Sequence, residues 1–201
     1  MRRAGSTAAL LLALLTVPAV LAAQDAKAQA QSEQSTPPTP TLSAPAAGGI
    51  RAEIIRSIEE AQKKLISLAE ATPAEKYGWR PAAGVRSTGE VFLHVAGGNY
   101  FLPTFWGTNP PAGIDLRNIE KNAGDKAQVI ATLNKSFDHA RQAILAAPEA
   151  ELNRNIKMFG RDSTLREAFL VVATHAHEHL GQSIAYARMN GITPPWSQGG
   201  Q

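Results

Sequence analysis

Cysteine is absent from this chain. Without it the protein can form no disulfide framework, no thiolate zinc finger and no covalent link to a c-type haem. It also lacks a thiol nucleophile and the cysteine on which a bacterial lipoprotein carries its lipid. Any metal ion must therefore be held by histidine rather than thiolate, and any thiol in the chemistry must come from another molecule.

Net charge is small as well. The 201 residues include 20 lysines and arginines against 17 aspartates and glutamates, which gives a formal charge of +3. Proteins that bind nucleic acid usually carry a clustered excess of basic residues. We therefore expect no nucleic-acid partner.

The longest apolar run covers residues 8–19 and follows Arg2 and Arg3. The segment then ends in two small residues, Ala22 and Ala23. This order is typical of a secretory signal peptide, and the run is shorter than the ~20 residues that a spanning helix needs. We expect residues 1–23 to be removed and the protein to be exported, periplasmic or secreted, with no stable membrane insertion after cleavage. An uncleaved anchor is the alternative.

Residues 24–48 have low sequence complexity. Of these 25 residues, 20 are Ala, Gln, Pro, Ser or Thr, and Leu42 is the only large apolar one. Such a segment buries too little apolar surface to offset the entropy lost on ordering. We interpret it as a disordered linker.

The remaining residues, 49–201, contain all 12 aromatic residues of the chain. Apolar residues recur there at spacings of three and four, which predicts amphipathic helices over about 49–71, 88–106, 125–147 and 163–190. No window shows sustained alternation of apolar and polar residues, so we expect no sheet. The sequence predicts an all-α four-helix bundle.

Local signals support the helix ends. Ser87 with Glu90 forms a capping box, Asp162 or Ser163 can cap the last helix, and Gly191 suits its C-terminal end. Gly97 and Gly98 lie inside the second helix, where each glycine costs up to ~1 kcal/mol relative to alanine. We expect close packing or ligand access at that level.

The expected connections are long, at about 72–87, 107–124 and 148–162. Long loops often carry function. The middle one could extend along the whole length of a ~30 Å helix. An overhand crossover, with the second and third helices parallel, is therefore allowed.

The five histidines are the main candidates for chemistry, because neutral imidazole is the commonest metal ligand. His175 and His179 are one turn apart on the last helix, about 40° from each other. Gln182 and Tyr186 continue the same stripe. His94, on the inward stripe of the second helix, is the candidate third ligand. Three histidines would leave an open position for water or substrate.

The alternatives are a hydrogen-bonded core histidine at position 94 and a helical His-x-x-x-His with no metal. His177 faces away from His175, and we interpret it as a solvated or interface residue. His139 lies off the apolar arc of the third helix, which predicts a surface position. Glu178 is a weak candidate for a catalytic proton carrier, and a solvated helix residue is the simpler reading.

The sequence from His175 to Ser197 resembles the C-terminal signature of the DinB/YfiT-like family. The matching positions are His175, His179, Gly181, Gln182, Tyr186, Arg188, Gly191, Pro194 and Pro195. Residues 88–96, around His94, and Trp79-Arg80-Pro81 also resemble that family. The resemblance covers about residues 51–197.

The resemblance implies a four-helix bundle, often dimeric, with a divalent metal ion held by His94, His175 and His179. Zinc or nickel is the most common metal in the family. Some relatives are thiol-dependent transferases or isomerases, in which a small thiol is thought to ionise on the metal. A possible homodimer and a small-molecule substrate or thiol partner are therefore expectations.

Two functions follow as hypotheses. The first is an exported metalloenzyme, a thiol-dependent transferase or a hydrolase, in which Gln182 and Tyr186 hold the substrate. The second is a stress protein that binds a metal or small ligand without turnover. A polar, accessible cavity beside the histidines would favour the enzyme, whereas a sealed apolar site would count against catalysis.

Overall fold

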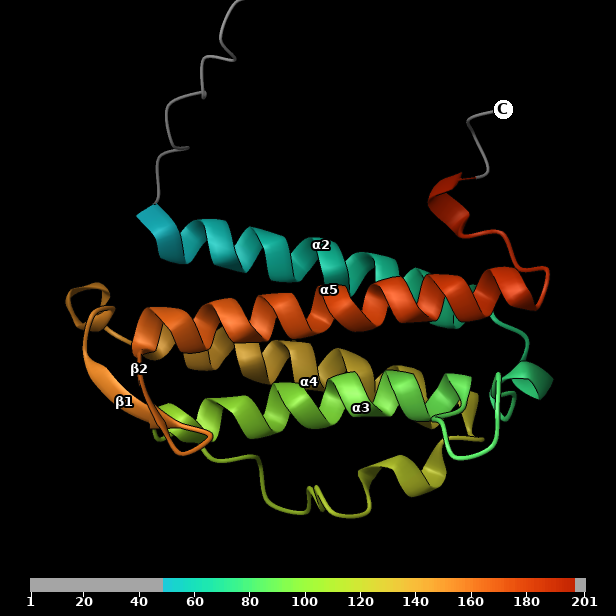
Figure 1. Cartoon of the computed structure of the whole chain (residues 1–201), viewed down its shortest axis with the longest axis horizontal. Coiled ribbons are helices and arrows are strands. Elements are labelled where there is room, and N and C mark those ends of the chain that lie inside the picture. Colours follow the sequence, from blue (N-terminus) through green and yellow to red (C-terminus); the bar gives the residue numbers. More distant parts are fainter. Residues whose placement is uncertain (1–48, 198–201) are drawn as a thin grey trace, which may run out of the picture. The chain divides into compact units, whose positions relative to one another are not determined.

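The computed structural model describes residues 49–197 (Figure 1). The predicted signal peptide, 1–23, and the predicted linker, 24–48, lie outside the described residues. Within residues 49–197, no helix has both the length and the hydropathy needed to cross a membrane.

Four long helices form a bundle, as the sequence predicted: α2 (Gly49–Ala71), α3 (Thr88–Phe101), α4 (Lys126–Ala146) and α5 (Leu165–Met189). Their predicted apolar faces meet in one core. Its members include Ile58, Leu65, Leu133, Phe137, Phe169 and Val172. An exception is Phe101, which is 42% exposed at the end of α3.

Contacts between helices define their directions. Lys126 Nζ, at the start of α4, donates to the carbonyl oxygen of Thr72 at 2.8 Å, just beyond the end of α2. These two helices are therefore antiparallel. Asn99 Nδ2 donates to Ser136 Oγ at 3.1 Å, and Trp106 Nε1 donates to the Ala143 carbonyl at 3.3 Å. Later residues of α3 thus meet later residues of α4, so these helices are parallel.

Parallel neighbours require a connection that returns along the bundle. Residues 107–124 make that return, and they include a short 3₁₀ helix, η3 (Ile119–Asn122) (Figure 1). The overhand crossover that the loop length allowed is therefore present. It runs beside α3 and places Ile119 and Glu120 next to the middle of that helix.

The helix ends follow the local chemistry. Ser87 Oγ accepts from the Glu90 amide at 3.4 Å and Glu90 Oε2 accepts from the Ser87 amide at 2.6 Å, which confirms the capping box. Gly191 has φ +72°, and the Ile192 amide donates to the Ala187 carbonyl at 2.9 Å, an arrangement typical of a helix C-terminus. Helix α3 tightens into a 3₁₀ turn, η2 (Leu102–Trp106), at Pro103.

The prediction that the chain has no sheet is wrong. Strands β1 (Asn155–Met158) and β2 (Arg161–Thr164) form an antiparallel hairpin that directly precedes α5 in the chain, with Met158 opposite Arg161. Each strand has only four residues, and in β1 only Ile156 and Met158 face inward. The alternation was therefore too short to detect.

The predicted cap of the last helix is also wrong. Asp162 and Ser163 belong to β2, and Thr164 is the N-cap, with its Oγ1 accepting from the Glu167 amide at 3.2 Å. The hairpin thus leads directly into α5.

Candidate metal centre

Three histidines from two helices meet inside the bundle. His94 comes from α3, and His175 and His179 come from successive turns of α5. One ring nitrogen from each lies within 4.8 Å of the others, and Nε2 of His94 is 3.4 Å from Nε2 of His175. Nitrogens bound tetrahedrally at 2.0–2.1 Å from zinc are about 3.4 Å apart. The three side chains could therefore hold one metal ion.

Two of the rings are oriented by hydrogen bonds on their far side. Nδ1 of His94 lies 3.1 Å from Oε1 of Glu120, and Nδ1 of His179 lies 2.8 Å from Oε1 of Gln182. A carboxylate or amide oxygen can only accept, so the proton of each imidazole lies on Nδ1. Nε2 then carries the lone pair, which is the tautomer that binds a metal ion.

These partners are themselves held in place. Glu120 Oε2 forms an ion pair with Nε of Arg86 at 3.0 Å. Gln182 Nε2 donates to the hydroxyl oxygen of Tyr186 at 3.1 Å, and Trp79 packs edge-on against that ring at 5.4 Å. Each chain of contacts fixes the orientation of one imidazole before any metal binds.

His175 is positioned by packing. Its Nδ1 is buried and has no hydrogen-bond partner among the described residues. A Cβ atom at Gly98 would lie 2.3 Å from Cε1 and 2.7 Å from Nδ1 of this ring. Only glycine therefore lets the ring approach α3 so closely, which confirms close packing at this glycine.

The electrostatics favour neutral imidazoles. Burial lowers the pKa of His175 to about 4, and the neighbouring His179 and His94 act in the same direction. Burial also lowers the pKa of His94, with a further contribution from the Arg86 charge. Unprotonated rings keep their lone pairs, so His94 and His175 can bind a cation at neutral pH.

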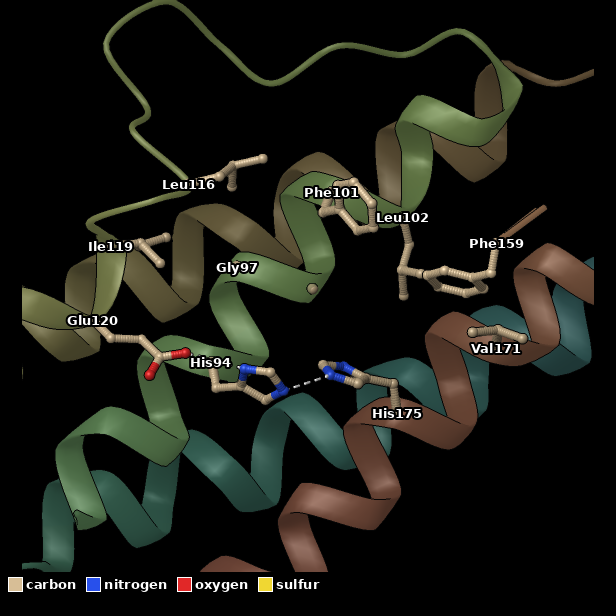
Figure 2. Close-up of a pocket in the computed structure, with 11 residues that line it drawn as sticks. His94, Gly97, Phe101, Leu102, Leu116, Ile119, Glu120, Phe159, Val171 and His175 are labelled. Carbon is tan, nitrogen blue, oxygen red and sulfur yellow. Dashed lines mark hydrogen bonds and ion pairs between the residues drawn. The ribbon is translucent and has the colours of Figure 1, made fainter. Parts of the chain in front are cut away.

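A cavity of about 410 Å³ opens beside His94 and His175 (Figure 2). Its polar end has these two rings and Glu120. The rest of its wall is apolar and comes from α3, the crossover, the hairpin turn and α5. These residues are Phe101, Leu102, Leu116, Ile119, Phe159 and Val171. The site is thus accessible, as an enzyme requires, but the cavity is less polar than we expected.

The sequence matches the DinB superfamily over residues 57–183, a stretch that contains all three histidines. The chain belongs to the DinB superfamily. A search of curated proteins finds no match.

Solved DinB-like structures share the fold. A DinB-like protein of Bacillus cereus has 18% identity and a TM-score of 0.59, over 72% of this chain and 95% of its own. YjoA, a DinB-like protein of Bacillus subtilis, has 20% identity and a TM-score of 0.56, over 70% and 93%. YfiT of Bacillus subtilis has 16% identity and a TM-score of 0.57, over 71% and 89%. It is described as "a probable metal-dependent hydrolase with an unusual four-helix bundle topology".

The remaining candidates of this DinB-superfamily chain lie elsewhere. Glu178 is exposed and does not line the cavity. His177 is exposed, as predicted, and its Nε2 lies 3.1 Å from the Ser57 carbonyl of α2. The predicted surface position of His139 is only partly right. Its ring packs 5.3 Å from that of Tyr100, with Nε2 buried, and burial lowers its pKa.

Two residues of the site were not identified from the sequence. Glu120 is 26 positions from His94, and only the length of the crossover indicated a functional segment there. Phe159 occupies the turn of a hairpin that was not predicted. The sequence around Phe159 contains no pattern that indicated a functional residue.

Proposed function

We propose that this protein is an exported metal-dependent enzyme that activates a small nucleophile beside an apolar cavity. The observation that carries the proposal is the meeting of three histidines beside an accessible cavity of about 410 Å³, whose wall includes His94 and His175. Cavities of about 300–1,000 Å³ are typical of small-molecule sites. A sealed site would have supported storage or a structural role instead.

Each residue has a defined task in this proposal. His94, His175 and His179 hold a divalent ion, zinc or nickel, through one ring nitrogen each. Such an ion lowers the pKa of a coordinated water or thiol, so that a nucleophile forms near neutral pH. Glu120 and Gln182 keep two of the rings in the binding tautomer. Gln182 and Tyr186 act on His179, which supports a positioning role more than the substrate contact we expected.

Hydrolysis is the first reaction to test. The description of YfiT as a probable metal-dependent hydrolase supports it. Water oxygen would bond to an acyl carbon, the bond to the leaving group would break, and the leaving group would take up a proton. Thiol transfer is the second reaction, and it needs an external thiol because the chain has no cysteine.

Metal content tests the centre directly. The purified protein should contain one divalent ion per chain by elemental mass spectrometry. His175→Ala should lose it. His177→Ala should keep it, because His177 lies on another face of α5 and contacts Ser57 of α2. Equal metal content in the two variants, or none in the wild type, would contradict the metal centre.

Turnover separates an enzyme from a binding protein. Neutral esters, amides and thioesters should be incubated with the metal-loaded protein, with and without glutathione. Hydrolysis that needs no thiol supports a hydrolase, and product that forms only with the thiol supports a transferase. A loaded protein that binds such compounds without converting them would support the non-catalytic alternative.

Export is a separate part of the proposal and depends on residues 1–23. Expression of the full chain and of a chain starting at residue 24 tests it. The full chain should be found shortened and outside the cytoplasm, and the shorter chain inside. A full chain retained uncleaved in the cytoplasm would contradict export.

A further inference from the structure

The turn of the β1–β2 hairpin has an unusual composition. Phe159 and Gly160 are its two central residues, with φ of +51° and +78°. Two-residue turns with both φ positive favour Asn-Gly or Asp-Gly, because asparagine and aspartate tolerate this backbone region better than bulky residues. Phe159 is the only non-glycine residue with positive φ in the described part of the chain. The backbone geometry of the turn therefore does not account for an aromatic residue at position 159.

The ring is not explained by the core either. Phe159 is 56% exposed, whereas the hairpin is anchored through Ile156 and Met158, which pack with Ala168 at the start of α5. The ring extends to the cavity instead. It lies 4.8 Å from the ring of Phe105 and 6.3 Å from that of Phe101, and it lines the cavity opposite the crossover. Figure 2 shows it beside Val171 and Leu102, at the end remote from His94.

The cavity also lacks a cation. Within residues 49–197, no lysine or arginine lines it, and Glu120 is its single charged residue. Arg86 does not line the cavity, and its guanidinium is paired with the Glu120 carboxylate at 3.0 Å. An anionic substrate group would therefore find no counter-charge at the apolar end, and it would lose hydration without compensation.

We propose that the substrate is an uncharged molecule whose aliphatic or aromatic group fills this cavity. Phe159 determines the size of the group that fits and the affinity with which it binds. This inference rests on the proposed function for the reacting group beside the histidines. The claim that an uncharged apolar group binds here depends only on the residues that line the cavity. A neutral apolar acyl ester, amide or thioester has the required chemistry: a reactive carbonyl for the polar end and an apolar group for the other.

Binding of two fluorescent probes tests the proposal without turnover. N-phenylnaphthylamine is neutral and apolar, and anilinonaphthalene sulfonate carries a similar ring system with a negative charge. The purified protein should bind the neutral probe more tightly. Preference for the sulfonate would overturn the uncharged substrate class.

Phe159→Asn tests the role of the ring, because asparagine suits the turn and removes the aromatic group. We expect the Kd of the neutral probe to rise about tenfold, which corresponds to the loss of some 50–60 Å² of apolar contact. The matched control is Leu170→Gln, which removes another exposed apolar side chain outside this cavity. An unchanged Kd in Phe159→Asn, or an equal rise in Leu170→Gln, would overturn the proposal. Circular dichroism should show that both variants remain folded.

His179→Ala separates this inference from the proposed function, because His179 does not line the cavity. This variant should lose the metal and still bind the neutral probe. If the wild-type protein contained no metal but its probe binding depended on Phe159, the proposed function alone would be refuted. If the wild-type protein contained metal but the Phe159→Asn variant bound the probe with an unchanged Kd, the substrate inference alone would be refuted.

Discussion

Nδ1 of His94 lies 3.1 Å from Oε1 of Glu120 and joins the candidate metal centre to the crossover. Glu120 belongs to η3, and the same carboxylate holds Arg86, which precedes α3. The crossover therefore supplies the partner that orients one of the candidate metal ligands. Such carboxylate–histidine pairs fix the tautomer and raise the basicity of the ring.

Replacement of Glu120 by alanine should weaken metal binding while leaving the fold intact. The His94 ring would lose the hydrogen bond at its Nδ1, and loss of such a partner typically costs about 10–100-fold in affinity. Competition titration with a zinc chelator measures the change. Glu151→Ala is the matched control, because Glu151 pairs with Arg154 at 3.0 Å and lies outside the site. Equal affinities in the two variants would show that Glu120 does not support the centre.

Gly98→Ala should disrupt the centre through His175. The added Cβ would lie 2.3 Å from Cε1 of the ring, so the ring must move away from Gly98 and out of its present position beside His94 and His179. Loss of stoichiometric metal, measured by elemental analysis, is the expected result.

Gly97→Ala is the matched control for this change. The nearest atom to its added Cβ is Cγ2 of Ile119 at 3.4 Å, an ordinary contact. This variant should keep its metal and gain up to ~1 kcal/mol of helix stability, seen in urea unfolding. Full metal content in Gly98→Ala would mean that the His175 ring can accommodate the added methyl group without losing the metal.

Much of the bundle was predictable because its signals are local. The capping box at Ser87 and the apolar spacing of α2 depend on residues within a few positions of one another. The pairing of His175 with His179 has the same origin, since one helical turn separates them. The meeting of His94 with this pair was also anticipated, because all three occupy inward stripes.

The parts that sequence reasoning missed depend on contacts between distant segments. The partner of His94 is Glu120, and that pairing exists only because the crossover runs back along α3. The hairpin was missed because β1 contributes two inward residues, Ile156 and Met158, too few for a period. Phe159 departs from the asparagine or aspartate that such a turn favours, so turn preferences gave no indication of a hairpin at this position.

Removal of the metal should lower thermal stability. A ligand that binds only the folded state at 100 times its Kd contributes about 2.7 kcal/mol, which for a domain of this size corresponds to roughly 5–10 °C in Tm. Scanning calorimetry with and without a chelator measures the difference. His175→Ala, which should bind no metal, provides the control and should show the same Tm in both conditions. An unaltered wild-type Tm would favour a bundle with three purely structural histidines.

Acid should destabilise the metal-free protein through His175. Its pKa in the folded state is lowered to about 4, chiefly by burial, whereas an unfolded histidine titrates near 6.5. Between these values the unfolded chain takes up a proton that the folded protein does not. The free energy of unfolding should therefore fall as the pH drops from about 6.5 to 4, by at most about 1.4 kcal/mol per pH unit for this group, and level off below.

Urea unfolding of the metal-free protein at pH 7, 5.5 and 4.5 measures this dependence. His175→Gln removes the titrating ring, so its free energy of unfolding should fall less steeply over the same interval. His94 and His139, whose pKa values burial also lowers, should account for part of the slope that remains. If wild type and His175→Gln had parallel pH profiles, the buried ring would not be the neutral group on which metal binding at neutral pH depends.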